Sequence, residues 1–184
     1  MWNAAIANWA GSANRAKLAR VEGWGRSASV AGIGCVVFAL GLLVYLMDRD
    51  ASKAALIPTV AWLAESHVFG ALGGWLPSFV HTFAFSLFTA AALPQRAVPR
   101  YGACFAWFAV NAAFEVGQHP QVSARLAEVL QGGLGGAPLT RPLASYFVYG
   151  TFDPGDIVAA LLGALAAGAV LRLLHRGRKE NHAQ

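Results

Sequence analysis

Four long runs of hydrophobic residues, each with few charges, divide the chain. They cover residues 27–47, 76–93, 101–116 and 157–174. A helix needs about 20 apolar residues to cross about 30 Å of hydrocarbon. The third run reaches that length only if it starts near Arg100 and continues through Glu115 to Gln118. The pattern predicts an all-α integral membrane bundle of four transmembrane helices in one domain.

The composition agrees with a membrane protein. Of 184 residues, 57% are hydrophobic and 12% are charged, and the mean hydropathy is +0.48. Soluble domains usually contain about 25% charged residues. A solvated globular surface is therefore hard to build from this chain, and the lipid bilayer is the expected partner.

Basic residues gather in alternate connections between the runs. Residues 1–29, 94–100 and 172–179 hold ten of the 14 Lys and Arg residues, whereas seven of the nine acids lie at or near the other connections. Lys and Arg near helix ends are retained on the cytoplasmic side. Both termini are therefore expected to be cytoplasmic. Anionic lipid headgroups then account for the pI of about 9.7 without a nucleic-acid partner.

The N-terminal segment, residues 1–26, differs in character from the membrane domain expected over residues 27–175. The first apolar run of the chain begins only after Arg26 and is too long for the core of a cleavable signal peptide, so we do not expect a signal peptide here. Trp2, Ile6 and Trp9 alternate with polar residues, as in an amphipathic helix on the membrane surface. A partly disordered tail is an equally good interpretation. Residues 176–184 form a basic cytoplasmic tail.

Two connections on the external side have some structure of their own. Residues 51–75 predict a short interfacial helix, because Pro58, Glu65, His67 and three nearby glycines argue against a fifth crossing. In the connection 119–152, residues 122–130 are typical of an amphipathic helix. The glycine-rich residues 132–136 predict a flexible turn, since a nucleotide-binding loop would need a preceding strand and a following Lys-Ser/Thr.

Small residues suggest how the helices pack. Cys35 and Cys104 lie inside predicted helices without metal-ligand spacing, so both are expected to be buried apolar residues and not disulfide partners. Rows of small residues at four-residue spacing let helix backbones approach closely. Two such rows predict packing faces, namely Ala31, Cys35, Ala39 and Ala159, Gly163, Ala167.

Ionisable residues recur at one depth in three of the predicted membrane helices. His81, Glu115 and Asp156 each lie 15 or 16 residues from a cytoplasmic basic residue, which is Arg96, Arg100 and Arg172 respectively. At about 1.5 Å per residue this is about 22 to 24 Å, near the outer edge of the hydrocarbon. Because a charge inside a bilayer is costly, these residues together are the best candidate for a site.

Spacing also places polar residues on shared helix faces that are able to converge. Asn111, Glu115 and Gln118 follow helical spacing, and Asp153 and Asp156 are three residues apart, as are Ser78 and His81. Simple structural roles compete with binding. Asp153 fits a helix N-cap ahead of Pro154. Glu115 fits a buried neutral carboxyl, and His81 fits an interfacial histidine.

Three segments resemble the signature regions of VanZ-like membrane proteins. They are residues 76–85 with His81, residues 114–118 with Glu115 and Gln118, and residues 150–163 with Asp153 and Asp156. The resemblance extends over about residues 30–175. It implies a small multi-pass protein of the bacterial inner membrane, linked in some members to glycopeptide resistance and without a firmly established reaction. The chain has Ala160, and Gly150 with Thr151, where that family often has an Asn and an Arg.

The first functional hypothesis is an envelope-facing binding site formed by His81, Glu115, Gln118, Asp153 and Asp156. Its ligand would be a polar headgroup, a glycopeptide-like compound or a cation. A phosphorylated lipid would need a bridging metal, or Arg125 or Arg141, because carboxylates repel phosphate. A transition metal is possible if His81 is a ligand, but the sequence selects no metal and no other cofactor. His67 and His119 are additional loop candidates.

Two other classes of function remain open. A membrane enzyme would use Glu115 or an Asp as general base with His81 as proton partner, although no nucleophile is recognisable. An accessory subunit of a larger membrane complex would use the small-residue faces, or the aromatic residues of the second run, as partner surfaces. Those aromatic residues are Phe79, Phe83, Phe85 and Phe88.

Overall fold

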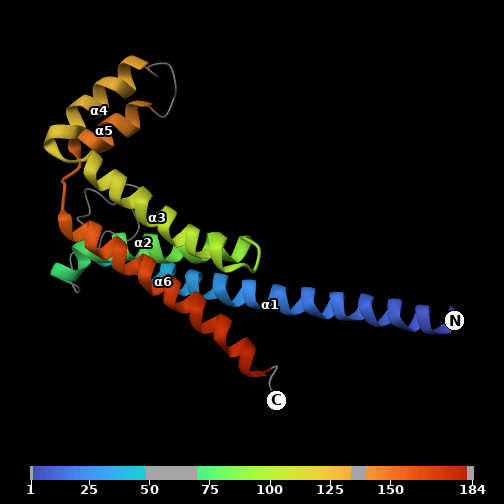
Figure 1. The fold of residues 1–184 in the computed structure, drawn as a ribbon. Helices are drawn as coiled ribbons and strands as arrows, with labels where there is room; N and C mark the ends of the chain where they lie inside the picture. Colours follow the sequence, from blue (N-terminus) through green and yellow to red (C-terminus); the bar gives the residue numbers. More distant parts are fainter. Residues whose placement is uncertain (1, 49–69, 134–139, 182–184) are drawn as a thin grey trace.

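The computed structural model describes residues 2–48, 70–133 and 140–181. These residues form an all-α structure of six helices (Figure 1). The helices are α1 (Trp2–Asp48), α2 (Ala71–Ala92), α3 (Ala97–Gly117), α4 (Pro120–Gly133), α5 (Thr140–Tyr149) and α6 (Pro154–Asn181). The all-α prediction is confirmed.

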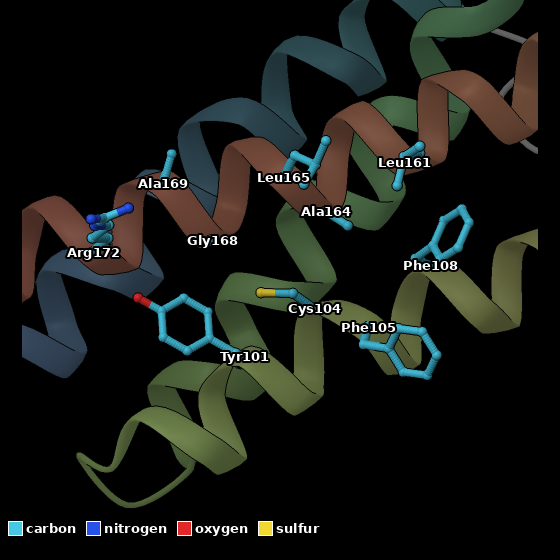
Figure 2. Close-up of a pocket in the computed structure, with 10 residues that line it drawn as sticks. All are labelled: Tyr101, Cys104, Phe105, Phe108, Leu161, Ala164, Leu165, Gly168, Ala169 and Arg172. Carbon is cyan, nitrogen blue, oxygen red and sulfur yellow. The ribbon is translucent and has the colours of Figure 1, made fainter.

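Helix α2 lies at the centre of the long helices, with α1, α3 and α6 packed on it. Successive long helices run in opposite directions, so the N-terminus, the α2–α3 turn and the C-terminus share one end of the molecule (Figure 1). The α4–α5 hairpin extends from the other end. Helices α3 and α6 also contact each other and border a groove (Figure 2).

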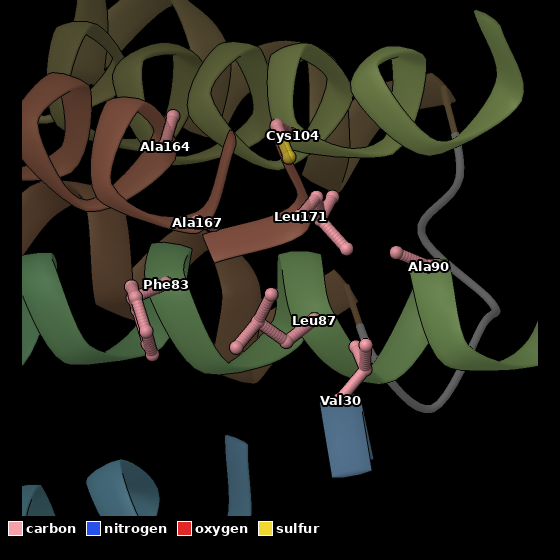
Figure 3. Close-up of a cluster of buried hydrophobic side chains, with 8 residues drawn as sticks. All are labelled: Val30, Phe83, Leu87, Ala90, Cys104, Ala164, Ala167 and Leu171. Atoms are coloured by element: carbon pink, nitrogen blue, oxygen red, sulfur yellow. The ribbon is translucent and has the colours of Figure 1, made fainter. Parts of the chain in front are cut away.

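The core lies around α2 and draws on all four long helices (Figure 3). Leu87 of α2 is fully buried at its centre, and Val30 of α1 is almost fully buried. The other members of the cluster are Phe83, Ala90, Cys104, Ala164, Ala167 and Leu171. These side chains hold the four helices together through close packing.

Glycines bring α1 and α6 close to α2 on two different faces. A Cβ atom at Gly34 or Gly41 of α1 would overlap side chains of α2, and one at Gly163 of α6 would overlap the backbone of Phe79. The predicted face with Ala159, Gly163 and Ala167 is confirmed, because all three residues are buried.

The other predicted small-residue face is wrong. Cys35 and Ala39 are exposed, and α1 packs through a neighbouring face containing Val30, Gly34 and Gly41. Residue spacing alone could not decide which of these two adjacent faces of α1 packs against α2, because both contain small residues. Burial is therefore confirmed for Cys104 and wrong for Cys35; both cysteines are free.

Several element boundaries differ from the expectations. Residues 2–26 are helical, as one of the two interpretations expected, and they continue without a break into the rest of α1. Helix α2 begins at Ala71, so residues 71–75 belong to it and not to an external helix. The rest of that predicted helix lies outside the described residues, as do Pro58, Glu65 and His67.

The long connection after α3 contains two helices instead of one. The predicted amphipathic helix is confirmed and is longer, as α4. Residues 140–149 were expected to be part of a loop but form α5, where Ala144 and Phe147 are buried. Phe147 packs against Gly117 at the end of α3, so tertiary packing stabilises this short helix. Residues 134–136 of the predicted glycine turn lie outside the described residues.

Two helices of the described chain are long and apolar enough to cross a membrane. The candidate spans are Gly23–Val44 within α1 and Pro154–His175 within α6. Large apolar side chains are also exposed along these helices and α3, including Leu40, Phe105 and Leu165. Large apolar side chains exposed on three helices favour contact with lipid or with another protein. Insertion in a membrane is thus possible on length and composition, while α2 and α3 do not pass the same test.

Candidate polar site at the ends of α2, α3 and α6

Asp153 begins α6 as its N-cap. Its Oδ1 atom accepts a hydrogen bond from the Gly155 backbone N–H at 2.8 Å, and its carbonyl accepts one from Asp156 N–H at 3.0 Å. Pro154 occupies the first helical position, where no hydrogen-bond donor is needed. The predicted cap is confirmed, so part of the role of this carboxylate is local.

Glu115 connects the end of α3 to the start of α6. Its side chain is 8% exposed, and its Oε1 atom accepts a hydrogen bond from the Asp153 backbone N–H at 2.5 Å. Asp153 and Asp156 are close enough for their charges to act on that of Glu115. Residues 38 positions apart in the chain are thus joined at one point.

Helix α2 supplies hydrogen-bond donors to both aspartates. The Ser78 hydroxyl donates to Asp156 Oδ1 at 2.7 Å, and the Trp75 indole N–H donates to Asp153 Oδ2 at 3.1 Å. Ser78 and Trp75 are three residues apart on α2, and both side chains reach the start of α6. The carboxylates of Glu115, Asp153 and Asp156, held by these donors, are called the carboxylate cluster below.

Gln118 lies beside the cluster, at the C-terminal end of α3. It is 8% exposed, and a Cβ atom at Gly150 would overlap its side-chain amide. Glycine at position 150 therefore leaves the space that Gln118 fills between α5 and α6. The structure places Gln118 close to the chain segment that leads into Asp153.

His81 lies on a different face of α2 and not in the carboxylate cluster. Its exposed ring is stacked with Phe85 at a centroid distance of 5.9 Å and is 6.4 Å from the ring of Phe38 in α1. The predicted layer is therefore divided: Glu115, Asp153 and Asp156 converge, whereas His81 contacts aromatic residues towards α1. The reason is the direction of each side chain around its helix axis. Residues at the same height on neighbouring helices meet only if their side chains also point toward one another.

Other candidate residues have local roles. His119 caps α4, because its Nδ1 atom accepts the Gln121 N–H at 3.3 Å, and its ring contacts Phe152. Asn111 donates to the carbonyl of Trp107 in its own helix at 2.9 Å. Trp75 was not singled out from the sequence, although its spacing from Ser78 was a usable signal.

The aromatic residues of α2 also pack internally. Phe83 is buried in the core, and Phe85 stacks on Trp107 of α3 with the ring centroids 4.9 Å apart. Phe85 and Phe88 further contact Phe38 of α1. These contacts place the aromatic rings between helices of the bundle, which weakens their interpretation as a partner surface.

The chemistry of the cluster follows from its oxygens. Three carboxylates close together create a negative potential that favours a cationic group. The hydrogen bonds described above use one oxygen each of Glu115 and Asp156, and each carboxylate has a second acceptor oxygen. Within residues 2–48, 70–133 and 140–181, no group of three or more His, Cys, Asp and Glu side chains is arranged to hold a metal ion.

Comparisons with protein-family models, curated proteins and solved structures found no match for this chain. The binding roles of His81, Glu115, Gln118, Asp153 and Asp156 stay predictions.

Proposed function

We propose that this chain is a VanZ-like integral protein of the bacterial inner membrane, in which α1, α2, α3 and α6 cross the bilayer and both termini are cytoplasmic. Two candidate spans, exposed apolar side chains and the alternating helix directions support this topology. Arg96 in the α2–α3 turn and Arg172 near the end of α6 lie towards the end that holds both termini, as retention of basic residues in the cytoplasm requires.

In this topology the carboxylate cluster faces the external side, and we propose that it binds the positively charged group of a polar envelope ligand. The ligand class is a headgroup or a glycopeptide-like compound carrying an ammonium group. The observation that supports this most strongly is the hydrogen bond from Asp153 N–H to the buried carboxylate of Glu115, which brings Glu115 to the start of α6, where Asp153 and Asp156 lie. A cation would offset the repulsion between them.

The same geometry favours binding over acid–base catalysis. The enzyme hypothesis pairs His81 with Glu115 or with an Asp of the cluster, whereas the ring of His81 packs against Phe38 and Phe85 on another face of α2. The acids instead accept hydrogen bonds from Ser78, Trp75 and a backbone N–H, which orient them as fixed acceptors. Such preorganised oxygens suit recognition of a cation.

Neutral substitutions in the cluster should weaken this binding. Dye-labelled vancomycin, whose amino sugar is positively charged, is titrated into the purified full chain in detergent. We expect Glu115→Gln and Asp156→Asn each to raise the Kd about tenfold or more, which corresponds to about 1.4 kcal/mol per factor of ten. Asp156→Asn retains an oxygen acceptor for Ser78, so we expect the variant to keep the helix content of the unmodified chain, as measured by circular dichroism.

Glu128→Gln is the matched control, because Glu128 is an exposed carboxylate on α4, outside the cluster. Its Kd should equal that of the unmodified chain. Equal Kd values for all four proteins would contradict a role of the cluster in binding. If the unmodified chain does not bind the probe, the glycopeptide-like ligand is wrong.

A further inference from the structure

A groove lies between α3 and α6, distinct from the carboxylate cluster. It has a volume of about 600 Å³, and its lining is mainly apolar (Figure 2). Phe105 and Phe108 come from α3, and Leu161 and Leu165 from α6. Phe105 is 70% exposed and Leu165 is 61% exposed, so large apolar side chains border a surface that the other described residues leave open.

The length of the groove matches the depth of one membrane leaflet. Its lining on α6 extends from Leu161 to Arg172. Eleven helical steps of about 1.5 Å give about 16 Å, close to half of a hydrocarbon core of about 30 Å. Small residues, Ala164 and Gly168, line it between the bulky side chains. An extended hydrocarbon chain fits a groove of this length and lining.

One end of the groove is cationic. Figure 2 shows the side chain of Arg172 and the hydroxyl of Tyr101 at the same end, away from Phe105 and Phe108. Arg100 precedes Tyr101, and its Nε and Nη2 atoms are buried without a hydrogen-bond partner among the described residues. The charge of Arg26 from α1 also acts on Arg100. The positive potential therefore lies at the end of the bundle that contains both termini.

We propose that this groove holds one acyl chain of an anionic phospholipid from the cytoplasmic leaflet, with the lipid phosphate at Arg172 and Tyr101. The proposal depends on the membrane topology given above but not on the carboxylate cluster. Basic pockets between membrane helices on the cytoplasmic side suit anionic headgroups. Charge complementarity favours this occupant over an uncharged partner helix, which would leave Arg172 at the rim without a counter-charge.

Native mass spectrometry of the full chain in detergent tests the proposal. The probe is an equimolar mixture of phosphatidylglycerol and phosphatidylcholine with distinguishable acyl chains. We expect the unmodified chain to retain one phosphatidylglycerol in at least about tenfold preference to phosphatidylcholine. Arg172→Gln should remove most of that preference, and Arg96→Gln, exposed in the α2–α3 turn and outside the groove lining, should retain it.

A second variant fills the groove without disturbing the backbone. A Cβ atom at Gly168 would lie 3.8 Å from the ring of Tyr101, an ordinary contact, so Gly168→Leu should fold and place its side chain in the groove. We expect it to retain several-fold less of either lipid. Gly102→Leu is the matched control, because a Cβ atom there meets nothing within 4 Å and Gly102 does not line the groove.

Three results would overturn the proposal. The first is equal retention of the two lipids by the unmodified chain, and the second is unchanged lipid retention in Gly168→Leu. The third is that the unmodified chain forms a dimer, that Gly168→Leu is monomeric, and that Gly168→Leu still retains lipid. The last result would identify a second copy of the chain as the occupant. Extraction of cell membranes with alkaline carbonate distinguishes failure of the topology from failure of the groove proposal. Release of the chain from the membrane would contradict the topology. A chain that stays in the membrane but shows no lipid preference would contradict only the lipid assignment of the groove.

Discussion

Asp153 combines a local and a long-range role within one residue. Its carboxylate caps α6 and accepts the indole N–H of Trp75, while its backbone N–H donates to Glu115. The cap was predictable because it depends on neighbours in sequence, Pro154 and Gly155. The contacts with Trp75 and Glu115 join residues 78 and 38 positions away, and no local rule predicts them.

These roles give different results for two substitutions of Asp153. Asp153→Ala removes the cap and the acceptor for Trp75, so it should lower the free energy of unfolding by about 1 to 2 kcal/mol. Asp153→Asn keeps an oxygen that caps helices well but loses the acceptor for Trp75, so it should lose less. Thermal unfolding in detergent, followed by circular dichroism, measures both. Equal losses in the two variants would show that the negative charge or the Trp75 hydrogen bond, and not the cap, stabilises α6.

His81 shows why depth alone did not define the site. Ser78 and His81 are three residues apart, which on a helix with 3.6 residues per turn leaves an offset of about 60° around the axis. That offset directs Ser78 to Asp156 and His81 to Phe38. Residue counting from the basic anchors fixed the height of each group, but the rotation of α2 between α1 and α6 decided which groups meet.

Among the helices, the position of α2 is fixed by close packing against α1 and α6. Gly41 of α1 and Gly163 of α6 allow close approach from two sides. The sequence predicted the α6 face correctly from the row that includes Gly163. It missed the α1 face and helix α5, because short or ambiguous patterns acquire their structure from packing partners, as Phe147 does from Gly117.

Gly163 should tolerate even a methyl group poorly. Gly163→Ala places Cβ against the backbone of Phe79, which cannot move as a side chain does, so we expect a loss of about 1 to 3 kcal/mol in the free energy of unfolding. Gly168→Ala on the same helix is the matched control, since its Cβ atom makes an ordinary contact. The control should be neutral or slightly stabilising, because alanine favours helix more than glycine does.

Unfolding of both variants in detergent with increasing denaturant gives the comparison. A Gly163→Ala variant as stable as the Gly168→Ala variant would contradict the close approach of α6 to α2.

For the whole molecule, the alternating directions of α1, α2, α3 and α6 put the α2–α3 turn on the side of the termini and the α4–α5 hairpin opposite (Figure 1). The distribution of basic residues along the chain predicted the same sidedness independently of any coordinates. Arrangement and charge thus support one topology.

Cysteine labelling in spheroplasts tests that topology. With Cys35 and Cys104 replaced by Ala, single cysteines are introduced at Gln131 in α4 and at Ala97 after the α2–α3 turn, both of which are exposed. A membrane-impermeant maleimide should label Gln131→Cys but not Ala97→Cys, because only the former faces outwards. Both should react after permeabilisation, which controls for reactivity. Labelling of both in sealed spheroplasts, or the reverse pattern, would contradict four crossings with cytoplasmic termini.

The sequence by itself determined the helical class, the start of α6 at its Asp153 cap, the amphipathic α4 and the asymmetry of basic charge. Each depends on composition or on residues a few positions apart. Only the tertiary structure decided that Glu115, Asp153 and Asp156 converge, that His81 does not join them, and that a groove opens between α3 and α6. The physical reason is that hydrophobicity and spacing define each helix separately, whereas side-chain packing sets the rotation of one helix against another.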